Sequence, residues 1–374
     1  MRNYKSIASC DVGFTPLLVL LGPNGAGKSN FVDALRFVAD ALNTTPADAV
    51  AKRGGLNEVL RQAPEAVDEF SIHLEFVSGE GRSSPVEYGF TIGRDSTGRR
   101  PLVVKEEHCV IHQVEGEPGS RPAQFHTADG LVLDGGGIER DRLYLPLAAT
   151  GEDFSGVYYD LRDMLFHHLD TDEMRKLHSD QRTGRIGYSG QHIGPVLGEL
   201  AFRYPAFKAR IDDYLRAIVP DALGIDERVV DKYSTVELRT RDGGRPFGPE
   251  AISVGTLHAA GVLTALFQPA VLDGEAKVVA IEEPETALHP AAAGALFDAL
   301  TEAGERVQVI VTTQSADLLD RDEVDPDFVR VVTMTEGVTV IGEIDEVSRR
   351  LVEDRRTTLG ELMRGGQLQP GAGE

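Results

Sequence analysis

Cysteine is scarce in this chain of 374 residues, with Cys10 and Cys109 as its only two. Two cysteines are too few for a disulfide framework, so we interpret them as small buried residues in a reducing compartment. No apolar run approaches the roughly 18 to 20 residues of a membrane span, and residues 1–13 lack the apolar core of a secretion signal. These absences predict a soluble cytoplasmic protein with no membrane contact.

Basic side chains are also in short supply. The 38 Lys and Arg face 60 Asp and Glu, which gives a net charge of −22 and a surface that on average repels nucleic-acid phosphates. Binding to DNA would therefore need a local basic patch, although the simpler interpretation of each candidate is an ordinary solvated face or a helix-end charge. The candidates are Lys52-Arg53, Arg94 with Arg99-Arg100, Arg203 with Lys208 and Arg210, and Arg349-Arg350 with Arg355-Arg356.

The most informative segment present is GPNGAGKS, residues 22–29, between the apolar run 17–21 and the helical pattern 30–42. This strand, glycine turn and helix form the setting of a phosphate-binding loop, here called the phosphate loop; the alternative is a plain glycine turn before a core helix. In such a loop Lys28 reaches the β- and γ-phosphates and the Ser29 hydroxyl holds Mg²⁺ at the helix N-terminus. The sequence therefore predicts that a nucleoside triphosphate binds with Mg²⁺ to Asn24, Gly25, Ala26, Gly27, Lys28, Ser29 and Asn30.

A second apolar run, 278–281, ends in Glu282-Glu283-Pro284-Glu285, as expected of a buried parallel strand that carries carboxylates at its carboxyl end. Glu282 is the predicted Mg²⁺ ligand and Glu283 the residue that orients or deprotonates the attacking water. The alternative is an acidic helix cap.

A third run, 307–311, ends in Thr312-Thr313-Gln314-Ser315. Gln314 is the candidate sensor of the γ-phosphate, unless it merely caps the helix expected at 316–319.

The hydrophobic content of 41% suits one large or two medium domains, and neither a repeat nor a heptad run is present. Alternating patterns at 70–76, 86–92, 105–112 and 229–240 predict strands, whereas 157–165 and 207–219 have helical spacing. The predicted organisation is a nucleotide-binding lobe with antiparallel strands (1–150), an inserted helical lobe (151–225), a segment completing the ATPase core (226–364) and a flexible tail (365–374).

The order of these segments, with Ile252–Thr256 (ISVGT) and the stretch Glu282–Pro290 (EEPETALHP), resembles the ABC-type ATPase heads of the RecF and OLD-like ATPases. These are relatives of the structural-maintenance-of-chromosomes (SMC) proteins. The resemblance implies an α/β fold of the P-loop NTPase class, with a mixed central sheet, an antiparallel subdomain and a helical lobe. It also implies a homodimer that sandwiches two ATP molecules. Ser253 and Gly255 of this signature segment would contact the partner's ATP, and Lys5 would lie near the nucleotide. We expect no nuclease module of the OLD type.

Some positions depart from this family. Val254 stands where relatives carry glycine or an acidic residue, and Gln314 replaces the usual switch histidine, so we expect slow hydrolysis. The glutamine that links the metal to the helical lobe is not identifiable among Gln62, Gln181 and Gln191. Two groups of residues contain ligand types that zinc uses, but their spacing does not favour a zinc site. They are His108-Cys109 with His112, and His167, His168 and His178.

The predicted function is a Mg²⁺-dependent ATPase whose ATP-driven dimerisation switches a partner, such as a nuclease or effector, or a nucleic-acid complex. By resemblance alone the setting is DNA repair or anti-phage defence. One alternative is an ATP-binding clamp with little turnover. Another is the ATPase subunit of a membrane transporter, but Lys28 and Glu282 are 254 positions apart, far more than in a compact transporter subunit.

Overall fold

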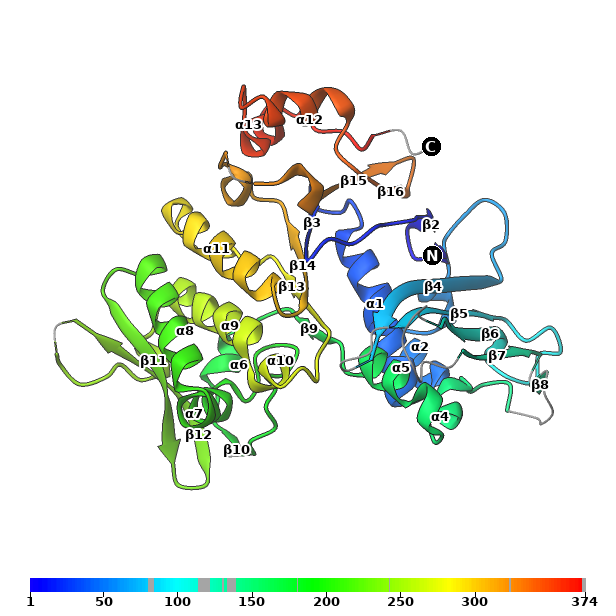
Figure 1. Ribbon diagram of the computed structural model, residues 1–374, viewed down its shortest axis with the longest axis horizontal. Helices are drawn as coiled ribbons and strands as arrows, with labels where there is room; N and C mark the ends of the chain where they lie inside the picture. The colour runs from blue at the N-terminus through cyan, green and yellow to red at the C-terminus, as the bar shows by residue number, and fades with distance from the viewer. Residues whose placement is uncertain are drawn as a thin grey trace. The chain divides into compact units, whose positions relative to one another are not determined.

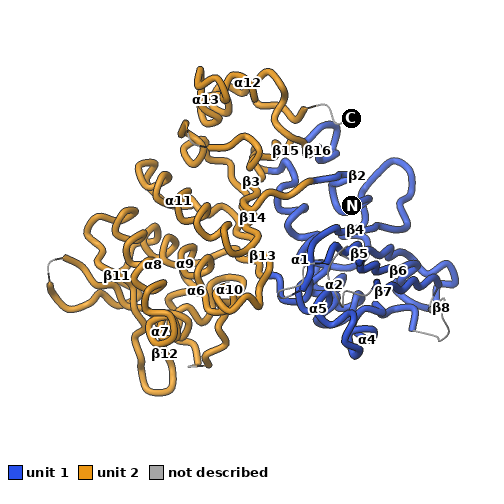
Figure 2. The backbone as a smooth tube through the Cα atoms, viewed as in Figure 1, with its two compact units in different colours: residues 1–12, 25–164, 334–340 blue, residues 13–24, 165–333, 341–374 orange. Residues whose placement is uncertain are grey.

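The computed structural model describes residues 1–79, 84–113, 122–129, 131–132, 139–179, 181–241, 243–322 and 324–371. It divides into two compact units, coloured separately in Figure 2. Unit 1 consists of Met1–Val12, Gly25–Met164 and Met334–Val340, and unit 2 of Gly13–Asn24, Leu165–Thr333 and Ile341–Glu374. The chain passes from unit 2 back into unit 1 within the phosphate loop, whose first three residues belong to unit 2.

Unit 1 is built on an antiparallel sheet with the strand order β8-β7-β6-β5-β4-β1-β2 (Figure 1). On the other side of β2, β16 (Val338–Gly342) adds a parallel neighbour through the pair Thr339 and Ile7. The antiparallel strands are β1 (Arg2–Tyr4), β2 (Ile7–Ser9), β4 (Glu69–Ser78), β5 (Ser84–Gly93), β6 (Val103–Ile111), β7 (Ala123–Ala128) and β8 (Leu131–Val132).

Aromatic side chains form much of the core of unit 1. Phe37, on the apolar face of α1, meets Phe70 edge to face with ring centroids 5.2 Å apart, and Tyr4 lies 5.5 Å from Phe70 in the same way. Such edge-to-face contacts add to the free energy gained by burying the rings. The helices of this unit are α1 (Lys28–Asn43), α2 (Pro46–Ala51), α3 (Leu56–Val59), α4 (Leu145–Ala148) and α5 (Glu152–Arg162).

Unit 2 contains a run of parallel strands in the order β15-β3-β14-β13-β9. They are β3 (Leu17–Leu21), β9 (Leu165–His167), β13 (Val278–Glu282), β14 (Gln308–Thr313) and β15 (Val329–Thr335), whose last two residues lie in unit 1. All five residues of β3 are buried, as expected for a parallel strand covered on both faces. A separate antiparallel sheet joins β10 (His178–Ser179), β12 (Tyr233–Thr240) and β11 (Ala222–Val230).

Helix α9 (Val254–Phe267) lies in the core of unit 2, and every residue from Thr256 to Phe267 is buried. Figure 1 shows α8, α9 and α11 side by side. The stretch Val254–Leu272, which continues into α10, is apolar and long enough to cross a membrane (mean hydropathy 1.3), yet 89% of that window is buried inside the protein. We interpret it as a core helix. Its interspersed Thr and His residues explain why the sequence showed no uninterrupted apolar run.

Unit 2 contains further helices and 3-10 turns. They are α6 (Thr171–Arg175), α7 (Ile193–Arg203), α8 (Pro205–Ile218), α10 (Pro269–Leu272), α11 (Ala293–Gly304), α12 (Glu346–Glu353), α13 (Leu359–Arg364) and the 3-10 turns η1 (Pro249–Ala251), η2 (Pro290–Ala292), η3 (Asp317–Leu319) and η4 (Pro326–Phe328).

The predicted α/β class is confirmed, and most predicted elements coincide with observed ones. Two local predictions were wrong. The helical pattern at 157–165 ends at Arg162, and Leu165 begins strand β9, because its apolar residues continue into a parallel ladder with β13. The strand predicted over 229–240 is interrupted at 231–232, where β11 turns into β12 and Asp231 adopts a positive φ of 58°. Of the predicted tail, residues 372–374 lie outside the described residues.

A buried carboxyl group in unit 1 makes the stability of the protein depend on pH. Glu107 is 0% exposed and accepts hydrogen bonds from the Tyr88 hydroxyl (3.0 Å) and from the backbone N–H groups of Leu145 (3.0 Å) and Tyr144. Burial raises the pKa of Glu107 from 4.5 to about 7, although these hydrogen bonds oppose the shift.

Because the folded pKa exceeds the unfolded one, the stabilising contribution of Glu107 is complete below about pH 4.5 and is lost as the pH rises through 7. We expect the free energy of unfolding of the wild type to fall by up to ~3 kcal/mol relative to Glu107→Gln between pH 4.5 and 8. Urea unfolding at a series of pH values measures this difference. Parallel profiles for the two proteins would contradict the prediction.

Candidate functional site

The first residues of the phosphate loop are fixed to the strands of unit 2. The Gly22 N–H donates to the Thr313 carbonyl of β14 at 3.2 Å. A Cβ atom at position 22 would lie 2.1 Å from the Val332 carbonyl oxygen, so only glycine fits between these strands. The chain therefore leaves β3 at a defined place and in a defined direction.

The second half of the loop opens helix α1 in unit 1. Gly25 and Gly27 have φ angles of 77° and 100°, in the left-handed region that favours glycine. The Gly27 carbonyl accepts the first hydrogen bonds of the helix, from the N–H groups of Asn30 and Phe31. Lys28 is only 6% exposed, whereas Ser29 is exposed. The N–H groups at this helix start are suited to bind phosphate oxygens.

A short chain of hydroxyl groups supports the loop within unit 1. The Thr339 hydroxyl, on β16, donates to the Ala26 carbonyl at 3.0 Å and lies 2.6 Å from the Ser6 hydroxyl. Asn30 Nδ2 donates to the same Ser6 oxygen at 2.6 Å. Thr339 also explains Gly27, because a Cβ there would lie 1.9 Å from its oxygen. Sequence reasoning missed Ser6 and Thr339, since nothing in the local sequence marks partners so far apart in the chain.

The predicted catalytic carboxylates lie at the carboxyl end of β13, in unit 2. Glu282 is in register with Thr312 of β14, and the Glu283 N–H donates to the Thr312 carbonyl at 2.9 Å. Glu283 has a φ of 46°, which turns the chain sharply out of the strand. Glu285, next in the motif, accepts a hydrogen bond from the Thr313 hydroxyl at 2.5 Å, and burial raises the pKa of its carboxyl group.

Two aromatic residues beside Glu282 were not predicted. The Tyr188 hydroxyl donates to Glu282 Oε1 at 3.3 Å. The ring of His168, just past the end of β9, stacks on Tyr188 with centroids 6.2 Å apart. Because β9 pairs with β13, its carboxyl end meets the acidic end of that strand. Strand β9 was hidden from the sequence by the helical pattern that overlaps it.

The three candidates for the linking glutamine lie in different places. Gln191 closes the turn that carries Tyr188, with its Oε1 accepting from the Ser189 N–H at 3.0 Å. Gln62 belongs to unit 1 and donates to the Asn57 carbonyl, and Gln181 is exposed. The structure thus brings Gln191 alone of the three into a segment that contacts Glu282.

Gln314 is exposed after the end of β14. It lines a groove of about 470 Å³ together with Gly22, Pro23 and Asn24 of the phosphate loop, and Gln369 lines it as well. The residue that caps η3 is Ala316, and the Asp317 N–H at its start donates to the Ser315 hydroxyl at 3.3 Å, so Gln314 does not serve as the cap. Gln314 is therefore available for a ligand beside the loop, as a γ-phosphate sensor requires.

The signature segment caps helix α9. The Ser253 hydroxyl accepts from the Thr256 N–H at 3.2 Å, and Val254 is 50% exposed. A Cβ at Gly255 would lie 2.4 Å from the carbonyl oxygen of Ala287, so the signature segment packs tightly against the stretch that follows Glu283. Ser253 is exposed, as contact with a second copy would require.

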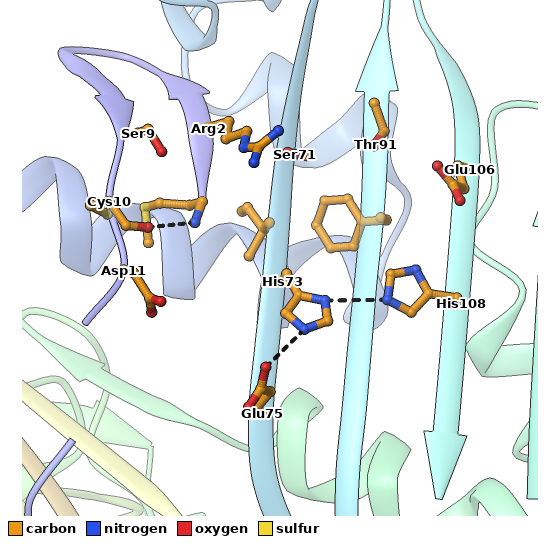
Figure 3. Close-up of a pocket in the computed structure, with 13 residues that line it drawn as sticks. Arg2, Ser9, Cys10, Asp11, Ser71, His73, Glu75, Thr91, Glu106 and His108 are labelled. Atoms are coloured by element: carbon orange, nitrogen blue, oxygen red, sulfur yellow. Dashed lines mark hydrogen bonds and ion pairs between the residues drawn. The ribbon is translucent and has the colours of Figure 1, made fainter. Parts of the chain in front are cut away.

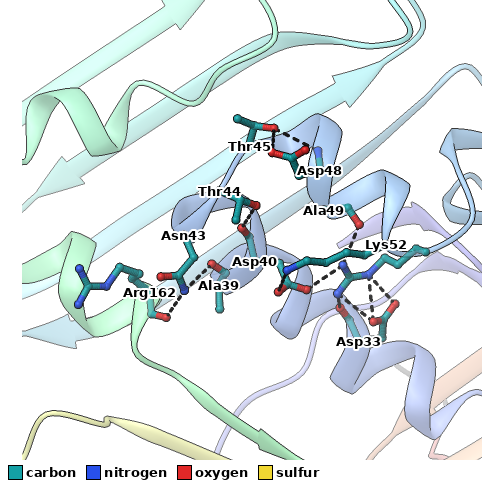
Figure 4. Close-up of polar contacts among 11 residues, drawn as sticks. Asp33, Ala39, Asp40, Asn43, Thr44, Thr45, Asp48, Ala49, Lys52 and Arg162 are labelled. Carbon is teal, nitrogen blue, oxygen red and sulfur yellow. Dashed lines mark hydrogen bonds and ion pairs between the residues drawn. The ribbon is translucent and has the colours of Figure 1, made fainter. Parts of the chain in front are cut away.

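Lys5 takes part in a network of ion pairs in unit 1. Its Nζ lies 2.6 Å from Asp33 Oδ2 on α1, and Arg53 bonds the same carboxylate. Burial opposes ionisation of Asp33, but Arg53 and Lys5 outweigh it and lower the pKa of this carboxyl. Figure 4 shows Lys52 on Asp40 beside this cluster. The structure gives Lys5 a protein partner, and its contact with nucleotide stays a prediction.

Most of the candidate basic patches are neutralised in the same way. Ion pairs with carboxylates are formed by Lys52, Arg53, Arg94, Arg100, Arg203, Lys208, Arg210, Arg349, Arg350 and Arg356. Paired cations attract a phosphate backbone less than free ones do, so these positions offer little to DNA.

The histidines of the antiparallel sheet make pairs rather than a metal centre. Figure 3 shows His108 of β6 facing His73 of β4 in a groove of about 410 Å³, with Nε2 and Nδ1 3.2 Å apart. Cys109 is buried on the opposite face, and burial raises its pKa to about 12. His167 is buried in unit 2, which lowers its pKa to about 4. Within the described ranges, no three His, Cys, Asp or Glu side chains are arranged to hold a metal ion.

The hydroxyl chain below the loop yields a test. Replacing Thr339 by Val keeps the side-chain volume but removes its hydrogen bonds to Ala26 and Ser6, which are worth about 1 kcal/mol each. We expect the Kd for ATP to rise roughly tenfold, measured by titration calorimetry. Thr127→Val, at another buried threonine of unit 1, is the matched control and should leave the Kd unchanged. Equal affinities for all three proteins would remove the supporting role of Thr339.

Comparison with known proteins agrees with this geometry. The family model AAA_21, described as "AAA domain, putative AbiEii toxin, Type IV TA system", matches residues 17–320. No functionally curated protein matches the sequence. The structure is similar to an Smc head bound to the C-winged helix domain of ScpA, with 15% identity, a TM-score of 0.53 and coverage of 93% of this chain and 97% of that chain. It is also similar to an Smc head with an extended coiled coil, bound to the C-terminal domain of ScpA, from Pyrococcus furiosus (14% identity, TM-score 0.52, coverage 95% and 98%). These likenesses confirm the predicted ABC-head fold.

Proposed function

Because the chain belongs to the AAA_21 family of AAA domains, we propose that it is a Mg²⁺-dependent ATPase head that dimerises around two ATP molecules. The observation that carries this proposal is the anchoring of two sites on one strand. Neighbouring carbonyls of β14 hold the start of the phosphate loop, at Gly22, and the candidate base, Glu283. A triphosphate bound by the loop and a carboxylate that activates water are the two parts that ATP hydrolysis needs.

The predicted donors are of the chemical kind that suits a magnesium ion. Glu282 offers carboxylate oxygens and Ser29 a hydroxyl, the hard oxygen ligands that Mg²⁺ prefers, and ATP would supply phosphate oxygens. When bound, Mg²⁺ would neutralise charge on the β- and γ-phosphates. The Tyr188 hydroxyl, 3.3 Å from Glu282 Oε1, would keep that carboxylate oriented.

In the proposed reaction, each of this chain's residues has one task. Lys28 and the N–H groups that open α1 bind the phosphates and stabilise the charge that develops on them. Glu283 orients a water molecule and accepts its proton while the water oxygen bonds to the γ-phosphorus. The bond to the bridging oxygen breaks, and ADP leaves with that electron pair. Gln314 would hydrogen-bond the γ-phosphate, without the positive charge of a histidine, which accords with slow turnover.

The proposed partner is a protein. The Smc heads to which this fold is similar are described as bound to domains of ScpA, and the family description names a toxin system. The net charge of −22 and the paired cations also favour a protein over bare DNA. We propose that the dimer acts in the cytoplasm, in anti-phage defence or DNA repair, as a switch for a nuclease or another effector. An ATP-binding clamp with little turnover is the second candidate, because Val254 and Gln314 depart from active relatives.

Dimerisation can be tested by blocking hydrolysis. Glu283→Gln keeps the shape of the side chain but cannot accept a proton, so ATP should persist and trap a dimer. Size-exclusion chromatography with light scattering should show a dimer for this variant with ATP and Mg²⁺, and a monomer for the double variant with Lys28→Ala, which cannot bind ATP. A Glu283→Gln protein that stays monomeric in saturating ATP would sink the sandwich mechanism.

The role of Gln314 can be tested against its neighbour. Removing the γ-phosphate contact with Gln314→Ala should lower kcat roughly tenfold while KM changes little, because that contact strengthens in the transition state. Gln369 lines the same groove, so Gln369→Ala is the matched control, and its turnover should stay at the wild-type level. Steady-state phosphate release measures both. Unchanged kcat in Gln314→Ala would refute the sensor role.

A further inference from the structure

One arginine of unit 2 holds the backbone that leads into the signature segment. Arg175, the last residue of α6, is 13% exposed at its side chain. Its Nη2 donates to the Ile252 carbonyl at 2.6 Å and its Nε to the Pro249 carbonyl at 3.1 Å. Pro249 is the first residue of the 3-10 turn η1, and Ile252 follows the end of this turn and directly precedes Ser253.

The Ile252 carbonyl is one that helix α9 itself does not use. The first hydrogen bond of α9 runs from the Leu257 N–H to the Ser253 carbonyl, so Ile252 stands outside the helical ladder. A planar guanidinium presents its donors in a fixed fork and can span two carbonyls at once. Arg175 therefore sets the direction in which the chain enters α9.

Arg175 is itself braced against neighbouring elements. Its own carbonyl accepts from the Thr235 hydroxyl of β12 at 3.1 Å. The preceding Met174 is 0% exposed and packs on α9, where a Cβ at Gly261 would lie 2.6 Å from its Cε. The contacts of Arg175 and Met174 thus link α6, β12 and α9 and hold the exposed start of α9 in place.

We propose that Arg175 is a positioning residue for the composite ATP site. It holds Ser253 and Gly255 in the conformation that receives the γ-phosphate of ATP bound by the other copy. Arg175 acts through the signature segment and touches no nucleotide. This inference rests on the proposed function, because only a signature that works in trans makes Arg175 serve a site on the partner.

The role in trans separates Arg175 from a residue that merely stabilises the fold. In a mixed dimer of Lys28→Ala and Arg175→Met chains, one site combines both defects. The other combines an intact phosphate loop with an intact signature segment. Each variant alone should lose at least tenfold in ATP turnover. A 1:1 mixture should recover about a quarter of the wild-type rate, since half the dimers are mixed and each has one intact site.

Three controls accompany this mixture. ATP should bind to Arg175→Met with a Kd within about twofold of the wild type, because the phosphate loop is intact. Arg330→Met removes a similarly buried arginine that bonds the carbonyls of Asp327, Val329 and Gly13 but none in the signature segment, and it should retain wild-type turnover. Lys28→Ala mixed with Ser253→Arg tests the composite site itself and should also recover about a quarter of the rate.

The outcomes are distinct. Recovery in both mixtures supports the proposal. Recovery with Ser253→Arg but not with Arg175→Met, or wild-type turnover by Arg175→Met alone, overturns the role of Arg175 and leaves the proposed function standing. No recovery with Ser253→Arg overturns the composite site and the role of Arg175 with it. If Arg175→Met does not fold, Arg175→Lys replaces it, because lysine keeps the charge but cannot span both carbonyls.

Discussion

Two consecutive backbone carbonyls of β14 hold two parts of the candidate site in unit 2. The Thr312 carbonyl accepts from the Glu283 N–H and the Thr313 carbonyl from the Gly22 N–H. Substitutions can change the side chains at a strand end. These backbone hydrogen bonds instead depend on β14 being in place and in register with both of its neighbours, β13 and β3. Central strands buried in a sheet are among the last parts of a protein to open. The candidate base and the start of the phosphate loop thus depend on a central, buried strand.

The parts that were predictable share a local signal. The phosphate loop, Glu282 and Glu283 each follow an apolar run and stand at its carboxyl end, a pattern that a single sequence displays. Strand β9 lacked such a signal, because Leu165 to His167 also continued a helical spacing, and its existence depends on pairing with β13. The positions of Tyr188 and His168 beside Glu282 were missed with it. The same applies to Thr339, whose bond to Ala26 joins residues 313 positions apart and is set by the fold alone.

The acidic character of the chain is reflected in its ion pairs. Most of the arginines and lysines that could have formed a nucleic-acid patch bond carboxylates instead, as Arg53 does with Asp33 and Asp40 and Arg203 does with Asp273. The more exposed of these pairs, such as Arg203 with Asp273, add little to stability, so their main effect is on the surface potential. What remains is a net negative exterior, and an ATP molecule must reach the loop against that field. Backbone N–H groups and the largely buried Lys28 attract the phosphates of ATP at short range, where the field of the whole surface matters least.

Helix α9 connects the remaining features. Its first turn carries the signature segment, and Gly255 lies so close to Ala287 that no side chain fits between them. One turn on, His258 is buried, and burial lowers its pKa, although the neighbouring backbone of Glu283 opposes this shift. The signature segment and the candidate base are therefore parts of one packed body. Under the proposed mechanism, a partner's ATP that engages the signature would press on the same body that holds Glu283. Because packed interiors deform little, ATP bound at one site would affect the position of Glu283 at the other site.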